Sequence, residues 1–201
     1  MQTIGVFGGT FDPPHIGHLV LAAEAQAQFG LERLLWVLTP DPPHKHGRAI
    51  SPVADRLAML ELAIAGDPGF VLSTVEMDRP APHFALDTLD ILAEQYPGAG
   101  LAYLMGGDSL RDLPAWRRPA DFVSACRFIG VMRRPGDRLD LPALEKSLPG
   151  LGSKVRFVQA PLLDIAAHAV RSRVAAGQPF RYFLPPGVYE YIVEKGLYRQ
   201  P

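Results

Sequence analysis

Residues 5–18 read GVFGGTFDPPHIGH, and this stretch decides the fold prediction. An apolar run ends on Gly8 and Gly9, which lack a Cβ and therefore let the backbone turn tightly and approach a ligand. The alanine-rich run 17–29 then predicts a helix that Gly30 ends. The start of a helix offers unpaired N–H groups and the positive end of its dipole. A strand, a tight turn and a helix start in this order therefore predict a phosphate-binding site.

The rest of the chain alternates between strand-like and helix-like segments. We expect strands at 3–7, 34–38, 70–75, 101–105, 126–132 and 155–159. We expect helices at 17–29, 51–66, 85–96, 167–176 and 188–195. Ser51 is the expected N-cap of the second helix, with Pro52 as its first residue, and 40–52 and 135–154 are expected loops. Strands that are apolar on both faces and alternate with helices predict an α/β, Rossmann-like fold. In this fold a mainly parallel sheet carries helices on both faces.

The composition narrows the class of protein. The length of 201 residues suits one domain over 1–201, and we expect its last part, about 164–201, to be a helical segment packed on the rest. The net charge is −1 and no long basic run occurs, so neither a nucleic acid nor a membrane surface is an expected partner. With no signal peptide and no apolar run long enough to span a membrane, we expect a cytoplasmic protein. Cys126 is the only cysteine of the sequence, which predicts no intrachain disulfide, no cysteine-based zinc site and a buried apolar position.

The chemically unusual segments each follow an expected strand. They are 8–18, 39–46, 106–116 and 133–136. In open parallel sheets, ligands bind at the carboxyl ends of the strands, near a switch in strand order. These segments therefore predict a nucleotide-type site at that edge of the sheet.

Two histidines, His15 and His18, stand three residues apart at the expected helix start. In the first turn they share a face and point into one volume. Imidazole groups can donate hydrogen bonds to phosphate oxygens and stabilise charge that develops in a transition state. Two alternatives stay open: a metal site, for which no further ligand lies beside the pair, and a structural role at the helix start. The segment matches neither the Gly-x-Gly-x-x-Gly dinucleotide fingerprint nor a P-loop.

The stretch GGTFDPPHIGH resembles the signature of the nucleotidyltransferase superfamily, in which a strand, a Gly-rich turn and His-x-Gly-His open a helix. Further segments resemble bacterial nicotinate-nucleotide adenylyltransferases in their order and spacing. They are PPHK (42–45), GGDSL (106–110), Trp116, RRPG (133–136) and LPPGVYEYIVEKGLY (184–198). The resemblance implies a nucleotidyltransferase-type fold. It also implies transfer of AMP from ATP to nicotinic acid mononucleotide, which forms deamido-NAD and pyrophosphate. Mg²⁺ would be carried by the ATP phosphates, with no metal site of the protein's own.

The resemblance also implies roles for single residues. For ATP these are backbone contacts from Gly8, Gly9, Thr10 and Phe11, and further contacts from His15, His18, Ile165, His168 and Arg171. His15, His18 and Arg171 would be catalytic. For the mononucleotide the residues are His44, Lys45, Ala85, Thr88, Asp108, Trp116 and Arg134. Asp108 would hold a ribose hydroxyl or an amide, cap the helix at Ser109, or do both. Trp116 would stack on the pyridine ring unless it is a core residue.

Two segments depart from the family pattern. DIAAHAVR (164–171) keeps Ile165 and Arg171 but lacks the usual hydroxyl side chains at 166–168, so Arg171, His168 and the helix N-terminus would hold the ATP phosphates instead. HFALDTL (83–89) has Ala85 where the family has a hydroxyl residue, so backbone N–H groups would read the nicotinate carboxylate.

Two rival functions follow from these departures. One is adenylyl transfer to nicotinamide mononucleotide or to another phosphate acceptor, such as phosphopantetheine. The other is a non-catalytic nucleotide-binding protein, which the altered 164–171 segment favours and the retained His15 and His18 disfavour. Pyrophosphate release from ATP in the presence of different acceptors distinguishes them.

Overall fold

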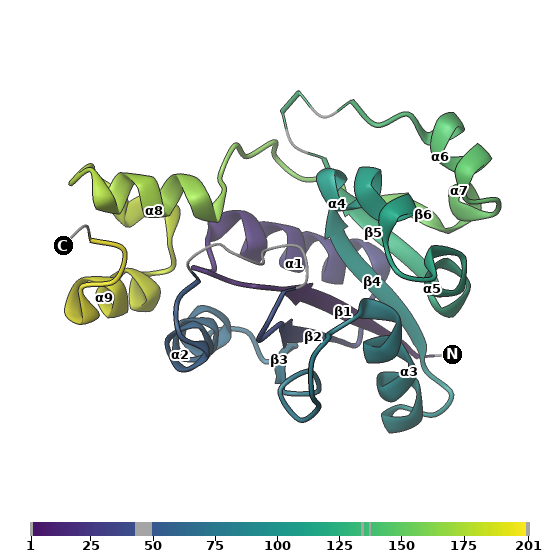
Figure 1. Ribbon diagram of the computed structural model, residues 1–201, viewed down its shortest axis with the longest axis horizontal. Coiled ribbons are helices and arrows are strands. Elements are labelled where there is room, and N and C mark those ends of the chain that lie inside the picture. Colours follow the sequence, from purple (N-terminus) through teal and green to yellow (C-terminus); the bar gives the residue numbers. More distant parts are fainter. Residues whose placement is uncertain (1, 43–49, 134, 137, 200–201) are drawn as a thin grey trace.

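The computed structural model describes residues 2–42, 50–133, 135–136 and 138–199. Within these residues, six strands form one sheet in the order β3-β2-β1-β4-β5-β6, and every adjacent pair is parallel (Figure 1). The strands are β1 (Thr3–Gly9), β2 (Arg33–Leu38), β3 (Phe70–Ser73), β4 (Gly100–Gly106), β5 (Phe128–Met132) and β6 (Val155–Phe157). The expected parallel sheet is confirmed. Its order reverses between β1 and β4, where Val6 lies between Leu35 of β2 and Tyr103 of β4.

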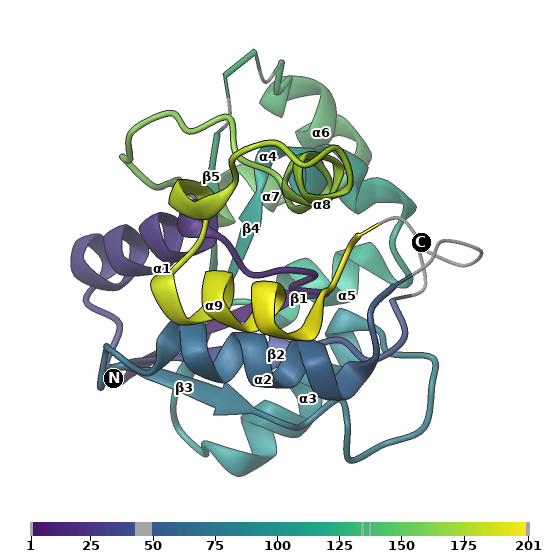
Figure 2. The ribbon, with the colours of Figure 1, turned by 90° about the vertical axis from the view of Figure 1, so that its left-hand side faces the viewer.

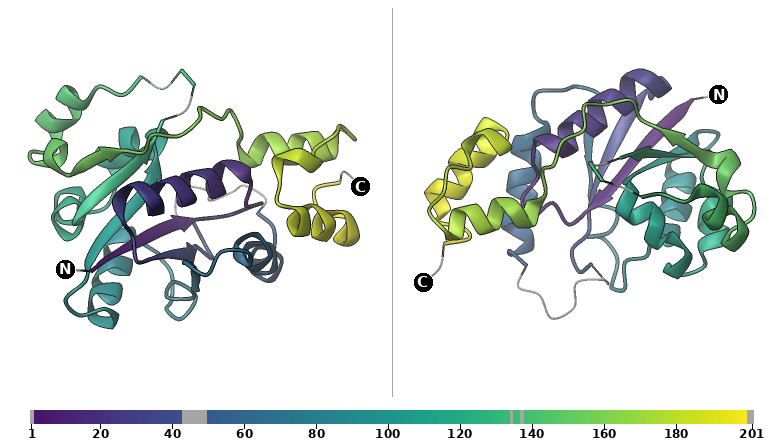
Figure 3. Two further views of the ribbon diagram at one scale, coloured as in Figure 1. Left: turned by 180° about the vertical axis from the view of Figure 1, so that it is seen from behind. Right: turned by 90° about the horizontal axis from the view of Figure 1, so that it is seen from above.

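Helices cover both faces of the sheet, as expected. They are α1 (Ile16–Phe29), α2 (Val53–Ile64), α3 (Ala85–Gln95), α4 (Gly107–Asp112), α5 (Pro119–Ala125), α6 (Leu141–Ser147), α7 (Leu151–Lys154), α8 (Ala167–Ala175) and α9 (Pro186–Lys195), with short 3₁₀ turns η2 (Leu113–Ala115) and η3 (Arg181–Phe183). Seen from behind, α1 lies across one face of the strands (Figure 3). Side chains of α1, α2, α8 and α9 share one apolar core with the sheet, and those of α3 and α5 share the other.

The continuous apolar run of β2 shows why one strand can serve both cores. Leu34 and Trp36 face the core that contains α1, whereas Leu35 and Val37 face the core that contains α3. Successive side chains of a strand point to opposite faces, so a strand covered on both sides must be apolar throughout. Cys126 also lies in the second core, where burial raises the pKa of its thiol to about 12, as expected for an inert position.

The last helix, α9, packs on α2, which is far from it in sequence. Helix α9 lies along α2 (Figure 2), and Val188 and Ile192 are buried in the same core as Met59. The Tyr191 hydroxyl donates a hydrogen bond of 2.8 Å to Asp55 of α2. None of the helices described is both long and apolar enough to cross a membrane.

Two local predictions were wrong. Helix α2 begins at Val53 with Pro52 as its N-cap, because the backbone of Ser51 is bound elsewhere: its N–H donates to Asp12 and its carbonyl accepts from Arg56. The expected loop 135–154 contains α6 and α7. Asp140 caps α6 by accepting a hydrogen bond from the Ala143 N–H, which is a signal that the sequence did carry.

Candidate active site

A cavity of about 620 Å³ lies at the carboxyl edge of the sheet. Gly8 and Gly9 at the end of β1, Met105 at the end of β4 and Met132 at the end of β5 all contribute to its wall. It therefore lies beside the position where the strand order reverses, between β1 and β4. Parallel sheets bind ligands at this place, and residues from three of the segments singled out in the sequence, 8–18, 39–46 and 106–116, line the cavity.

The Gly-rich turn, residues 8–12, begins with the last two residues of β1 and needs their small size for close packing. A Cβ on Gly8 would lie 2.7 Å from the Tyr103 hydroxyl oxygen, and one on Gly9 would lie 2.9 Å from the Phe11 ring. Phe11 has a φ of 46°, an unfavourable backbone conformation that its buried ring keeps in place by packing on Phe7 and Trp36. Gly8, Gly9 and Thr10 line the cavity, whereas Phe11 is buried beneath them.

His15 and His18 meet at the start of α1 and both line the cavity. Their rings stack with centroids 3.6 Å apart, and the His15 backbone N–H donates a hydrogen bond of 3.1 Å to Nδ1 of His18. Because that Nδ1 accepts, the neutral His18 ring carries its proton on Nε2. A Cβ on Gly17 would lie only 3.1 Å from Nδ1 of His15, which accounts for the glycine between the histidines. The pair can therefore present an N–H donor to a phosphate in the cavity.

Asp12 holds the Gly-rich turn against the carboxyl-terminal part of the chain. The Arg171 Nη1 of α8 donates a hydrogen bond of 2.6 Å to the Asp12 carbonyl, and the Tyr198 hydroxyl donates one of 2.6 Å to Asp12 Oδ1. Within the segment 164–171, Ile165 reaches the cavity wall, whereas His168 is exposed. Arg171 thus contacts the turn that carries the histidines, and the described wall of the cavity includes neither it nor His168.

A buried arginine fixes the two loops on this edge of the sheet. Arg56 is 1% exposed, and its guanidinium donates hydrogen bonds to four carbonyl groups. They belong to Ser51 (3.0 Å), Thr10 (3.1 Å), Thr39 (2.8 Å) and Pro40 (2.6 Å). The turn after β1, the loop after β2 and the start of α2 therefore share one donor group. No motif in the sequence around Arg56 predicts this role.

The opposite wall of the cavity comes from the segments that follow β4. Trp116 is half-buried and packs edge-to-face on Phe122 at 5.2 Å, so it is part of the core and also lines the cavity. Asp108 lines the cavity from the first turn of α4, where one carboxylate oxygen accepts from the Ser109 N–H at 3.0 Å. The alternative in which Asp108 caps a helix at Ser109 was wrong, because α4 begins at Gly107 with Gly106 as its N-cap.

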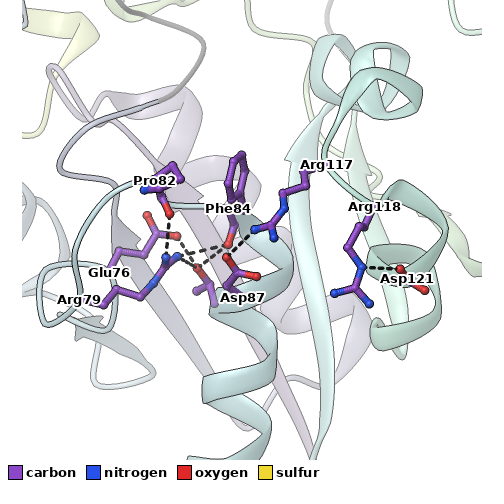
Figure 4. A network of polar contacts seen from close by, with 9 residues as sticks. Glu76, Arg79, Pro82, Phe84, Asp87, Arg117, Arg118 and Asp121 are labelled. Atoms are coloured by element: carbon purple, nitrogen blue, oxygen red, sulfur yellow. Dashed lines mark hydrogen bonds and ion pairs between the residues drawn. The ribbon is translucent and has the colours of Figure 1, made fainter.

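The start of α3 completes the wall and rests on a buried polar network (Figure 4). Ala85 lines the cavity, and Thr88 lies one turn below it. The Thr88 hydroxyl donates a hydrogen bond of 2.6 Å to Glu76 and accepts one of 3.0 Å from Arg79. Thr88 therefore supports the helix start, and neither it nor Arg79 is among the described wall residues.

Several wall residues were not predicted from the sequence, and among them Glu76, His83 and Arg117 have side chains that can carry a charge. Glu76 and His83 are 4% and 7% exposed, and burial lowers the pKa of His83, which keeps its ring neutral. His83 lies well after the end of β3 and just before α3. A position between a strand and a helix is only a weak indication of a binding site. His44, Lys45 and Arg134, expected to contact the mononucleotide, lie outside the described residues.

Comparisons with known proteins show the family and the fold of the chain. The family model described as cytidylyltransferase-like matches residues 6–173. A protein of Thermomicrobium roseum named a probable nicotinate-nucleotide adenylyltransferase is 45% identical over 99% of this chain and 92% of its own. A protein of the same name from Roseiflexus is 42% identical over 98% of each chain. In fold, the chain is similar to Plasmodium falciparum nicotinic acid mononucleotide adenylyltransferase complexed with NaAD, with a TM-score of 0.82, 17% identity and 98% of each chain covered.

Proposed function

This chain belongs to the nicotinate-nucleotide adenylyltransferases, within the cytidylyltransferase-like proteins, and on that basis we propose that it transfers AMP from ATP to nicotinic acid mononucleotide. The products are deamido-NAD and pyrophosphate, and the protein is a nucleotidyltransferase of NAD biosynthesis. The observation that carries the proposal is the stacked pair His15 and His18, which lines the cavity at the end of β1. We expect the reaction to take place in the cytoplasm.

The reaction needs no nucleophile from the protein. The 5′-phosphate of the mononucleotide forms a bond to the α-phosphorus of ATP, while the bond between that phosphorus and the bridging oxygen breaks and pyrophosphate leaves. A phosphate is ionised near neutral pH, so a strong general base is unnecessary. Catalysis then depends on positioning and on stabilising the negative charge of the transition state. The Nε2–H of His18 is the donor that we assign to this role.

The two substrates occupy the two walls of the cavity in this proposal. ATP lies against Gly8, Gly9 and Thr10, with its phosphates at the histidines and near Ile165. Arg171 supports the ATP side of the cavity indirectly, because its hydrogen bond of 2.6 Å to the Asp12 carbonyl fixes the Gly-rich turn. The mononucleotide lies against Trp116 and the start of α3, with Asp108 as an acceptor for its ribose.

We further propose that Mg²⁺ enters with ATP. The carboxylates of the described cavity wall are those of Glu76 and Asp108, so the protein offers few of the oxygen ligands that Mg²⁺ requires. The described residues also contain no cluster of three or more His, Cys, Asp or Glu side chains with metal-binding geometry. The phosphate oxygens of ATP and water would then supply most of its ligands. A bound ion would supply positive charge beside the leaving pyrophosphate.

Pyrophosphate release tests the function directly. The purified protein is incubated with ATP and Mg²⁺, and with nicotinic acid mononucleotide, nicotinamide mononucleotide or phosphopantetheine as acceptor. We expect the highest kcat/KM with nicotinic acid mononucleotide. A clear preference for another acceptor would replace the proposed substrate, and no release with any acceptor would favour the non-catalytic alternative.

A further inference from the structure

The proposed acceptor carries a carboxylate on its pyridine ring, and this carboxylate needs a partner in the cavity. Two of the described wall residues, Glu76 and Asp108, have acidic side chains and would repel it. His83 is held neutral by burial, and we have assigned His15 and His18 to the phosphates of ATP. Arg117 is the only Lys or Arg among the wall residues that the structure describes.

Arg117 lies where the ring of the acceptor is expected. It follows Trp116, one of the aromatic wall residues, and stands opposite the start of α3 (Figure 4). Its guanidinium carbon lies 4.6 Å from the centre of the Phe84 ring, and its Nη1 lies 3.2 Å from Oδ2 of Asp87. Phe84 and Ala85 also line the cavity, so the charged group lies between the two segments that enclose this end of it.

The contacts of Arg117 hold the guanidinium without using all of its donors. A guanidinium has five N–H groups in a plane, and the Asp87 contact uses one nitrogen. The Phe84 ring supports the flat face of the group by a cation–π contact. The side chain is 49% exposed, so it can change rotamer at low cost. Its remaining N–H groups can donate hydrogen bonds to a carboxylate, which replaces water, while the guanidinium keeps its contact with Phe84.

We propose that Arg117 is a specificity-determining residue, whose guanidinium binds the nicotinate carboxylate and thereby selects nicotinic acid mononucleotide over nicotinamide mononucleotide. This inference rests on the proposed function. A carboxylate offers two acceptor oxygens to the guanidinium fork. A carboxamide offers one oxygen, and its NH₂ group cannot accept from an N–H donor. The chain has no hydroxyl at Ala85, so the guanidinium supplies side-chain donors that this helix start lacks.

The neighbouring Arg118 provides a matched control. It is also exposed and paired with an acidic residue, at 2.7 Å from Asp121, but the described wall of the cavity does not include it. In Figure 4 the Arg118 side chain points to the Asp121 helix, whereas that of Arg117 points to Phe84 and Asp87. Arg117→Gln and Arg118→Gln each remove one positive charge at adjacent positions, so non-specific electrostatic effects should be similar.

The experiment measures kcat/KM for both mononucleotides at saturating ATP and Mg²⁺. Arg117→Gln should lower the value for nicotinic acid mononucleotide about tenfold, the size expected of a charged hydrogen bond that water partly screens. The value for nicotinamide mononucleotide should change by less than about twofold. Arg117→Lys keeps the charge and should recover part of the selectivity. Arg118→Gln should leave the ratio of the two values unchanged.

Two outcomes would overturn the inference. If Arg117→Gln lowers both values equally, the side chain has a structural role only, and if it changes neither, the guanidinium does not contact the acceptor. Thermal melts of each variant show whether the fold is retained, and the ratio of the two values is insensitive to the fraction of folded enzyme. A wild-type protein that releases no pyrophosphate with either acceptor would instead contradict the proposed function itself.

Discussion

Replacement of the buried Arg56 by leucine should destabilise the protein more than most single substitutions. The guanidinium donates hydrogen bonds of 2.6–3.1 Å to four carbonyl groups, and three segments of the chain supply these groups. Leucine fills part of the volume but donates nothing. The carbonyl groups of Ser51, Thr10, Thr39 and Pro40 would then be buried without this donor, or the loops would open to admit water.

The magnitude follows from the number and burial of these bonds. Each hydrogen bond to a charged group contributes about 1.5–3 kcal/mol, but four bonds to one group are not additive. A buried carbonyl group left without a donor costs about 1–3 kcal/mol, so with partly overlapping costs for the four groups we expect a loss of about 3–5 kcal/mol in free energy of unfolding. For a chain of this size, that loss lowers the melting temperature by roughly 6–20 °C.

Thermal and urea unfolding monitored by circular dichroism measure this effect. Arg56→Lys should fall between the wild type and Arg56→Leu, because an ammonium group cannot reach all four carbonyl groups at once. Arg111→Leu is the control, since Arg111 is exposed and its ion pair with Asp112 is long, at 3.6 Å, so its effect should stay within about 0.5 kcal/mol. A loss below about 1 kcal/mol for Arg56→Leu would refute the reasoning.

Three further predictions concern the site and the pH dependence. His18→Ala should lower kcat roughly 100-fold or more with a much smaller change in the KM for ATP, if its N–H stabilises the transition state; unchanged kcat in pyrophosphate release would remove it from the mechanism. Trp116→Ala should raise the KM for the mononucleotide and leave that for ATP nearly unchanged, whereas lower stability with unaltered kinetics would make it a core residue only. Burial raises the pKa of Tyr103 and Tyr198 above the ordinary value of 10.0, so the unfolded chain loses these protons first and stability should fall as the pH rises above about 10. Thermal melts between pH 8 and 11 should show a smaller fall for Tyr198→Phe than for the wild type.

The long elements could be predicted because their signals are local. The strand β1, its two glycines and helix α1 follow each other directly, and Gly30 ends α1 in the left-handed conformation, with a φ of 58°. The short helices α4 to α7 could not be predicted in the same way, because four to seven residues give less than two turns and no readable period.

The candidate site also contains parts that local sequence predicts and parts that it does not. The histidine pair could be located from the sequence, because residues three apart in the first turn of a helix lie on the same face. Arg117 and Glu76 could not be assigned to one cavity, since they follow different strands and come together only through the order of the sheet. Arg56 resembled any arginine of an amphipathic helix, and its burial depends on the loops that fold over it.

The hydrogen bond between Tyr198 and Asp12 joins residues that are 186 positions apart. On the ribosome, Asp12 therefore emerges long before its partner has been made. At about 5–20 residues per second, the Gly-rich turn spends about 10–40 s without this anchor. A nascent chain stalled before residue 198 can contain all six strands and still lack one of the contacts that fix the Gly-rich turn. This hold on the turn thus depends on the synthesis of a tyrosine that is remote in sequence from the histidines.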